Sequence, residues 1–235
     1  MHLLIPAAGV GRRMGSDRNK LLLTLRSQPL LCWTLQAALM AEKISWIGVI
    51  YQPIDYDDIQ DILQKLEVNK PIDLIVGGQT RQESVYNGLQ KLPTDAKHVL
   101  IHDGARCLAT PSLFNRCAVE MASCQGLIAA IPVKDTIKIV DGDGFIQSTP
   151  ERQFLWAAQT PQGFDVDLLK SCHHEGVRQG WQVTDDAALF ERCGYQVKIV
   201  PGEETNLKVT TPQDLAIADF ILTTRNLDVR FGILD

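Results

Sequence analysis

The chain has 235 residues and a formal net charge of −5, with 45% hydrophobic and 22% charged residues. The negative charge argues against nucleic acid or an anionic membrane as the main partner, because both favour broad basic patches. No apolar run approaches the roughly 20 residues that a membrane-spanning helix requires. The length is large for one small domain and short for two, so we expect one α/β domain with an appendage.

The six cysteines are scattered along the chain without a Cys-x-x-Cys pair. The sequence begins directly on a predicted strand, without the basic segment that is typical of a secretory signal. We therefore expect reduced thiols and a cytoplasmic location.

A glycine-rich loop follows the first predicted strand. The strand is the apolar run 3–5, and the loop contains Gly9 and Gly11, with the cations Arg13 and Lys20 close behind. Glycines let backbone amides approach an anion, and the two cations supply compensating charge. The stretch therefore indicates a binding site for a polyphosphate.

Other interpretations of this loop make different demands on its spacing. A dinucleotide-binding fingerprint needs a further glycine where Met14 stands, and an acidic residue about 20 positions on, yet none lies between Asp17 and Glu42. A Walker loop needs Ser or Thr after the lysine, but Lys20 precedes Leu21. A polyphosphate loop that uses side-chain cations remains, alongside a simple tight turn with solvated arginines.

The following segments alternate between helical and strand patterns. Apolar spacing predicts helices over 29–41, 55–66, 79–92 and 111–123, and strands over 47–51, 72–76, 99–101 and 127–133. Such alternation predicts a mostly parallel sheet with helices on both faces and ligands outside the carboxyl ends of the strands.

Polar loops follow two of these strands. The loop 77–81, with Ser84 one turn later, and the loop 102–106, with Asp103, should face the same crevice as Gly9. A carboxylate near a triphosphate would be repelled unless a hard cation lay between them, so Asp103 is a candidate magnesium ligand. Its alternative role is a turn or helix cap.

The pattern changes after Lys134. Polar and apolar residues alternate on both sides of Asp141-Gly142-Asp143-Gly144, which predicts a β-hairpin over 135–152. An isolated two-stranded hairpin is marginal in water, so this one should pack against something. The Asp-x-Asp could also suggest a metal-dependent glycosyltransferase, but both aspartates precede a glycine in a tight turn.

The last third of the chain should return to the α/β pattern. We expect helices over 165–178 and 184–193, the second capped by Thr184 and Asp185, a strand over 196–201 and a final helix from 211. Lys208 is a cation at an apolar strand end, which is costly unless an anion compensates its charge.

Five separated motifs resemble those of the cytidylyltransferases, and specifically the 2-C-methyl-D-erythritol 4-phosphate cytidylyltransferase family of the non-mevalonate isoprenoid pathway. They cover the chain from Pro6 to about Leu222, in the family's order. Gly104 and Cys107 depart from the family, which has alanine and proline there. The matching stretches are Pro6-Ala7-Ala8-Gly9 with Gly11-Arg12-Arg13-Met14 and Lys20, Gly78 with Ser84, His102-Asp103 with Arg106, Thr160-Pro161-Gln162, and Asn206-Leu207-Lys208-Val209-Thr210.

The resemblance implies a single Rossmann-like nucleotidyltransferase domain over 1–235, with the 135–152 hairpin as a dimerisation arm. It also implies transfer of CMP from CTP to 2-C-methyl-D-erythritol 4-phosphate, with Mg²⁺, in a homodimer. The implied roles are catalysis by Arg13, Lys20 and Lys208; nucleotide binding by Pro6, Ala7, Ala8, Gly9, Gly11, Gly78, Ser84 and Asp103; metal binding by Asp103; and binding of the second substrate by Arg106, Thr136, Arg152, Thr184 and Asp185.

Three alternatives share part of this pattern. A cytidylyltransferase for a pentitol phosphate such as ribitol 5-phosphate would have the same fold and signature. A metal-dependent glycosyltransferase would need an Asp-x-Asp at a strand end. A non-catalytic regulator would bind CTP without releasing pyrophosphate.

Overall fold

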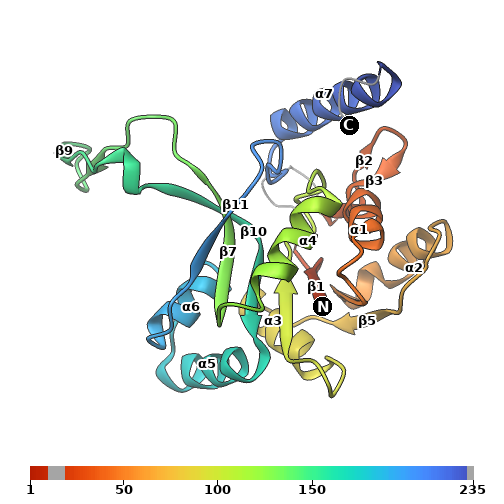
Figure 1. The fold of residues 1–235 in the computed structure, drawn as a ribbon, viewed down its shortest axis with the longest axis horizontal. Coiled ribbons are helices and arrows are strands. Elements are labelled where there is room, and N and C mark those ends of the chain that lie inside the picture. Colours follow the sequence, from red (N-terminus) through yellow and green to blue (C-terminus); the bar gives the residue numbers. More distant parts are fainter. Residues whose placement is uncertain (10–18, 232–235) are drawn as a thin grey trace.

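A seven-stranded sheet forms the centre of the protein, with helices packed on both of its faces (Figure 1). The computed structural model describes residues 1–9 and 19–231, with the side chains described as far as residue 225. Spatially, the strands follow the order β11-β7-β10-β6-β1-β4-β5. All neighbours run parallel except β10, which is antiparallel to both β6 and β7. The predicted α/β class and mostly parallel sheet are confirmed.

The elements follow the predicted alternation, with boundaries that shift by a few residues. The strands of the main sheet are β1 (His2–Pro6), β4 (Trp46–Tyr51), β5 (Ile72–Val76), β6 (His98–Ile101), β7 (Gly126–Pro132), β10 (Trp156–Asp165) and β11 (Lys198–Pro201). The helices are α1 (Leu30–Met40), α2 (Tyr56–Gln64), α3 (Arg81–Gln90), α4 (Pro111–Glu120), α5 (Val166–Gln179), α6 (Asp186–Arg192) and α7 (Pro212–Phe231). A small sheet, β2 (Thr24–Leu25) with β3 (Gln28–Pro29), precedes α1, and short 3-10 turns cover Lys20–Leu22, Pro53–Asp55 and Arg152–Phe154.

Strand β1 shows how the sheet separates two hydrophobic cores. Successive side chains of a strand point to opposite faces. Leu3 and Ile5 accordingly pack with α1, α2 and α4 on one face, whereas Leu4 packs with α3, α5 and α6 on the other. All three are fully buried. The apolar run that looked like a simple buried strand therefore contributes to both layers.

Strand β10 was not predicted from the sequence. It contains Pro161, a residue that is rare in central strands because it cannot donate a ladder hydrogen bond. The structure places it at an irregularity, where the register of β10 against β7 shifts between Ala158 and Gln162. The bulge therefore lets a central strand carry the proline.

The expected strand end around Lys208 is wrong. Residues 204–210 form a loop between β11 and α7, fixed by a fully buried asparagine. The amide nitrogen of Asn206 donates to Gln159 Oε1 at 3.1 Å and to the Thr160 carbonyl at 2.8 Å. Lys208 is therefore held by a loop anchored to β10.

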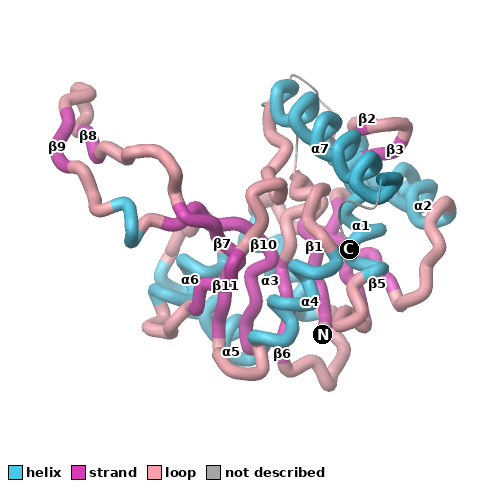
Figure 2. Tube along the Cα trace, turned by 45° about the horizontal axis from the view of Figure 1, so that its top comes forward, coloured by secondary structure: helices cyan, strands magenta, loops and turns pink. Residues whose placement is uncertain are grey.

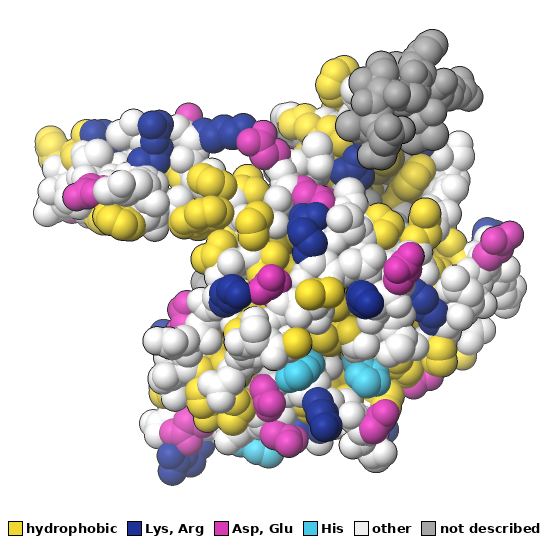
Figure 3. Space-filling view, in the orientation of Figure 1, with side chains coloured by type: hydrophobic (Ala, Val, Ile, Leu, Met, Phe, Trp, Pro, Cys, Tyr) yellow, Lys and Arg dark blue, Asp and Glu magenta, His cyan; other side chains and the backbone are white. Residues whose placement is uncertain are grey.

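The hairpin predicted over 135–152 is present as β8 (Ile139–Val140) paired antiparallel with β9 (Ile146–Ser148). It projects away from the sheet on two long connections (Figures 1 and 2). Hydrophobic side chains gather on this arm and where it joins the body (Figure 3). Phe145 and Phe154 are 72% and 74% exposed. In this single chain, the arm thus lacks an apolar surface to cover its own side chains.

Within the described part of the chain, no helix combines the length and apolar character needed to cross a bilayer.

Candidate active site

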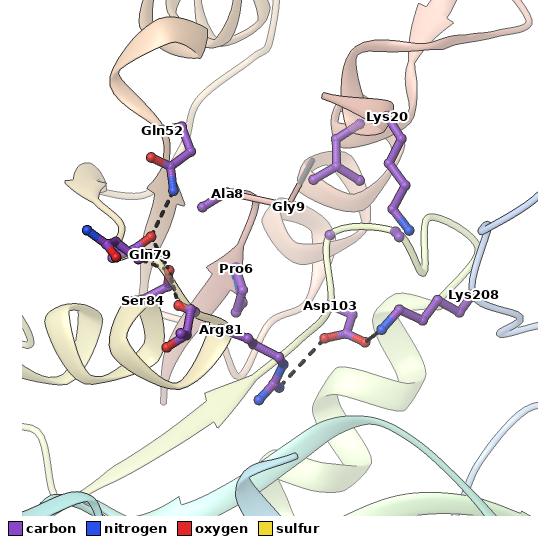
Figure 4. Close-up of a pocket in the computed structure, with 15 residues that line it drawn as sticks. Pro6, Ala8, Gly9, Lys20, Gln52, Gln79, Arg81, Ser84, Asp103 and Lys208 are labelled. Atoms are coloured by element: carbon purple, nitrogen blue, oxygen red, sulfur yellow. Dashed lines mark hydrogen bonds and ion pairs between the residues drawn. The ribbon is translucent and has the colours of Figure 1, made fainter. Parts of the chain in front are cut away.

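A polar pocket lies at the carboxyl ends of the parallel strands, where the sequence placed the ligand site (Figure 4). Its volume is about 340 Å³. Residues from the β1, β5 and β6 loops meet there with Lys20 and Lys208, so segments far apart in the sequence share one cavity. The lining consists of Pro6, Ala8, Gly9, Lys20, Leu21, Gln52, Gly78, Gln79, Thr80, Arg81, Ser84, Asp103, Gly104, Ala105 and Lys208.

The loop after β1 contributes only part of its predicted set. Pro6, Ala8 and Gly9 line the pocket, but Ala7 is fully buried in the core and donates its amide to the Ile50 carbonyl at 2.7 Å. The predicted sites Gly11 and Arg13 lie outside the described residues. Ala7 therefore anchors the loop to β4 and does not line the pocket.

Asn19 ties the end of this loop to its beginning. The side-chain amide of Asn19 donates to the Ala7 carbonyl at 2.6 Å and to Asp55 Oδ2 at 2.9 Å. Its oxygen accepts from the Leu21 amide at 3.0 Å. Because Asn19 is 6% exposed and directly precedes Lys20, these bonds set where the Lys20 backbone enters the pocket.

The loop after β5 is held by its own polar groups. The Ser84 hydroxyl accepts from the Gly78 amide at 3.0 Å and donates to the Thr80 carbonyl at 2.8 Å. Gln52 donates to the Gly78 carbonyl at 2.9 Å. A Cβ on Gly78 would lie 2.4 Å from the Cβ of Glu83, so only glycine fits here. Gly78 and Ser84 line the pocket as predicted, with their polar groups engaged with this loop and Gln52.

The Asp103 backbone is fixed by a buried histidine network. The Asp103 amide donates to the Thr160 hydroxyl at 3.0 Å, and this hydroxyl contacts His102 Nδ1 at 3.0 Å. His102 Nε2 lies 3.2 Å from the Arg106 carbonyl. Burial lowers the pKa of His102 to about 4, so the ring is neutral at neutral pH. A neutral ring that donates from Nε2 and accepts at Nδ1 satisfies both contacts.

The Asp103 carboxylate lies between two cations. Its Oδ2 is 2.6 Å from Lys208 Nζ, and its Oδ1 is 3.7 Å from an Arg81 guanidinium nitrogen. Burial alone would raise the pKa of Asp103, but the charges of Arg81 and Lys208 outweigh it and lower the pKa to about 2. The carboxylate is therefore ionised at neutral pH, and it is the anion that Lys208 was expected to need.

Lys20 and Lys208 both line the pocket and meet at one loop. Lys20 Nζ donates to the Val209 carbonyl at 2.9 Å, and the Val209 amide donates to the Ala105 carbonyl at 2.9 Å. Both ammonium groups thus lie beside the loop 206–210, near Asp103. The arrangement gathers positive charge where an anionic ligand would enter.

Asp103 fits a magnesium ion only as one ligand among several. No cluster of three or more His, Cys, Asp or Glu side chains suited to a metal occurs in the described ranges 1–9 and 19–225. Mg²⁺ is commonly held by one or two carboxylates together with substrate phosphates and water. The single carboxylate at the pocket matches that pattern and not a preformed metal cage.

Five residues predicted to bind the second substrate lie outside the pocket lining. The Arg106 guanidinium donates to the carbonyls of Asn206 and Ala158 at 2.7 and 3.2 Å, so it bridges two backbone segments. Thr136 is exposed at the base of the arm, and Arg152 donates to the Lys134 carbonyl at 2.7 Å.

Thr184 and Asp185 lie at the start of α6. Thr184 is exposed, and Asp185 caps the helix by accepting from the Ala188 amide at 2.9 Å. Asp185 also accepts from Gln162 Nε2 at 2.8 Å. The predicted helix-cap role is therefore confirmed for Asp185 and wrong for Thr184, which precedes the cap. The substrate contacts of both remain predictions.

Arg81 and Asn19 are among the residues that the sequence did not assign to the site; Gln52, which lines the pocket and donates to the Gly78 carbonyl, is another. Arg81 closes the predicted pocket loop 77–81, but nothing in its local sequence indicates a role for it. Asn19 had no local signal, because its partners Ala7 and Asp55 are distant in sequence. Arg81 could have been noted as the first helical residue after a Gly-Gly loop, whereas its partner Asp186 lies 105 residues away.

This combination of fold and pocket defines a class of protein. A mostly parallel α/β sheet with a glycine-rich loop and convergent cations at the carboxyl ends of its strands is an arrangement suited to a nucleotide.

Solved structures with this fold include 4-diphosphocytidyl-2C-methyl-D-erythritol synthase from Anaerococcus prevotii, with a TM-score of 0.85 and 32% identity over 94% of this chain and 97% of that one. The 2-C-methyl-D-erythritol 4-phosphate cytidylyltransferase from Thermus thermophilus has a TM-score of 0.75 and 31% identity over 93% and 97%. The chain is a nucleotidyltransferase.

Sequence comparison identifies the family. The family model described as 2-C-methyl-D-erythritol 4-phosphate cytidylyltransferase matches residues 1–224. A relative of that name from Nostoc sp. (strain PCC 7120) is 71% identical over 96% of this chain and 99% of the relative. Another, from Synechocystis sp. (strain PCC 6803), is 66% identical over 96% and 98%. The chain belongs to the 2-C-methyl-D-erythritol 4-phosphate cytidylyltransferase family, as the resemblance of its motifs implied.

Proposed function

We propose that this protein transfers CMP from CTP to 2-C-methyl-D-erythritol 4-phosphate and releases pyrophosphate, a step in isoprenoid precursor biosynthesis. Its membership of the family supports this assignment. The structural observation that carries it is the ionised Asp103 between Lys208 and Arg81, in a pocket that Lys20 also lines. A site with this charge pattern suits a nucleoside triphosphate better than an uncharged ligand.

The chemistry needs charge neutralisation more than proton transfer. A phosphate oxygen of the acceptor attacks the α-phosphorus of CTP in line, and pyrophosphate leaves. Because the attacking oxygen is already ionised, no general base is needed, and alignment and electrostatic stabilisation supply most of the rate. Lys20 and Arg13 stabilise the triphosphate and the departing pyrophosphate. Lys208 neutralises charge at the attacked phosphorus.

A divalent cation is part of this proposal. Asp103 is the residue that would hold Mg²⁺, which would supply positive charge to offset that of the phosphates. Lys208 Nζ lies 2.6 Å from Oδ2 of this carboxylate, so Asp103 would also hold the Lys208 ammonium beside the nucleotide phosphates.

A pyrophosphate-release assay with a panel of acceptors tests the assignment. With CTP, release should depend on 2-C-methyl-D-erythritol 4-phosphate and be far slower with ribitol 5-phosphate. The other nucleoside triphosphates serve as controls for base selection. A preference for ribitol 5-phosphate would replace this function with the pentitol alternative, and CTP binding without any release would favour a regulator.

We further propose that the arm over 135–152 joins two copies of the chain and completes each site with residues of the other. The support is that Thr136 and Arg152 lie on the arm, outside this chain's pocket lining, and that the arm's apolar side chains are exposed. A hairpin of this size is not stable alone, so a second arm is a suitable partner.

Complementation between two inactive variants tests the shared site. A Lys20→Ala chain and an Arg152→Ala chain are mixed and allowed to exchange subunits. If Arg152 acts in the partner's site, each mixed dimer contains one site with both lesions and one with neither, so activity should recover to about a quarter of wild type at equal mixing. No recovery after verified exchange would place Arg152 in its own chain's site.

The proposal places the protein in the cytoplasm. All six cysteines are free thiols in the structure, as expected in a reducing compartment. Thiol titration of unfolded protein, isolated under conditions that prevent air oxidation, should find all of them reduced.

A further inference from the structure

The guanidinium group of Arg81 is shared unequally between two carboxylates. Nη1 of Arg81 donates to Asp186 Oδ2 at 2.8 Å, whereas Nη2 lies 3.7 Å from Asp103 Oδ1, beyond hydrogen-bond distance. Figure 4 shows Arg81 extending from α3 toward Asp103 across the pocket. The guanidinium is therefore bound to Asp186 and only near Asp103.

Asp186 is well placed to hold this cation. It is the first residue of α6, directly after the cap Asp185, and is 1% exposed. His173, equally buried, lies on its other side, with Nε2 3.6 Å from Asp186 Oδ1. Asp186 is absent from the pocket lining, so it has no access to a ligand there. Its hydrogen-bonded charged partner, within the described residues, is Arg81.

We propose that Asp186 is a positioning residue that holds Arg81 back from Asp103, so that the Asp103 carboxylate stays open to Lys208 and to the divalent cation of the nucleotide. The proposal rests on the proposed function, since it concerns how the same pocket accepts a metal-bound nucleotide. It assigns a purpose to an ion pair between the pocket residue Arg81 and the buried Asp186 that otherwise only joins α3 to α6.

Removal of the Asp186 charge should redirect Arg81. With Asp186→Asn, the guanidinium loses its nearer anion, and Asp103 remains as a close carboxylate. If Nη2 moves from 3.7 Å to a hydrogen-bonded distance of about 2.8 Å from Asp103 Oδ1, the attraction between Arg81 and Asp103 increases. At an effective dielectric constant of about 20, this increase weakens the binding of a competing cation to Asp103 about tenfold. The variant should therefore need about ten times more divalent cation to fill the site.

Metal binding without turnover gives the direct readout. Mn²⁺ is titrated into protein with CTP and no acceptor, and free Mn²⁺ is measured by electron paramagnetic resonance. Asp186→Asn should raise the apparent Kd for Mn²⁺ about tenfold. The double variant Arg81→Gln, Asp186→Asn removes the competing cation and should return the Kd to within about threefold of wild type. Glu191→Gln, an exposed change on the same helix, should leave it unchanged.

The variants also separate positioning from a purely structural role. Asp186→Asn leaves Arg81 partly buried without its main partner and is expected to lower the melting temperature, but lower stability alone would not be rescued in the Mn²⁺ titration by Arg81→Gln. If Asp186→Asn does not fold, Arg81→Gln alone decides: it removes a cation near Asp103 and should bind Mn²⁺ at least as tightly as wild type. Weaker binding in that variant would overturn the proposal.

A further control distinguishes failure of this inference from failure of the proposed function. Asp103→Asn should abolish the protein's contribution to Mn²⁺ binding. If it binds Mn²⁺ like wild type, the metal role of Asp103 in the proposed function is wrong. If Asp103→Asn is defective but Asp186→Asn binds Mn²⁺ normally, the metal site stands and the positioning role of Asp186 is refuted.

Discussion

Replacement of Asn19 by alanine should destabilise the fold and loosen the backbone that leads into Lys20. The Asn19 side chain makes three buried hydrogen bonds, to the Ala7 carbonyl, the Asp55 carboxylate and the Leu21 amide, at 2.6, 2.9 and 3.0 Å. Neutral hydrogen bonds contribute about 1 kcal/mol each and one to a charged group about 2 kcal/mol, so we expect Asn19→Ala to lower the free energy of unfolding by about 4 kcal/mol.

Urea denaturation followed by circular dichroism measures this loss. Asn115→Ala is the matched control, because the Asn115 side chain accepts one exposed hydrogen bond, from the Lys43 amide at 2.9 Å. The control should lose less than about 1 kcal/mol. If Asn19→Ala is no less stable than the control, the hydrogen bonds of Asn19 do not anchor this loop. At temperatures where the variant is folded, turnover should still fall, because Lys20 follows the released residue.

Three further predictions concern charge in and around the pocket. Lys20→Ala should lower turnover at least about a hundredfold with the fold intact, the cost of one transition-state donor, whereas Lys91→Ala, an exposed change at the end of α3, should not; near-normal activity of Lys20→Ala would contradict its role. Excess chelator should abolish activity and magnesium should restore it, and full activity in chelator would remove the metal role of Asp103. Burial lowers the folded-state pKa of His102 to about 4, so as the pH falls from 6.5 toward 4 the unfolded chain binds a proton that the folded chain does not. The wild type should therefore lose about 3 kcal/mol of stability over this range, whereas His102→Gln should not. Equal acid sensitivity of the two proteins would refute this.

Local pattern was enough to predict the framework of the fold. The apolar strands, the helical spacing between them and the polar loops at their ends gave the parallel sheet and located the pocket near Gly9, Ser84 and Asp103. These features depend on neighbours within a few residues, so periodicity and turn chemistry reveal them.

The features that were missed depend on distant partners. Pro161 hid a central strand, because only the pairing of β10 with β7 shows that the proline lies at a bulge. Lys208 was assigned to a strand end, whereas Asn206 holds it in a loop anchored to β10. Arg81 gains its orientation from Asp186, more than a hundred residues away in the sequence. No local signal reports such contacts.

The antiparallel direction of β10 makes the arm a hairpin loop between neighbouring strands. Because β7 ends where β10 begins, at the same end of the strands, the arm connects them directly. It is closed at its base, where the Val133 amide donates to the Leu155 carbonyl at 3.0 Å. The number of residues in the arm can therefore change without altering the order or direction of the strands, and a short turn could replace it. The arm, which we propose joins two subunits, is thus a detachable module: it could be removed or lengthened while the pocket loops after β1, β5 and β6 are left in place.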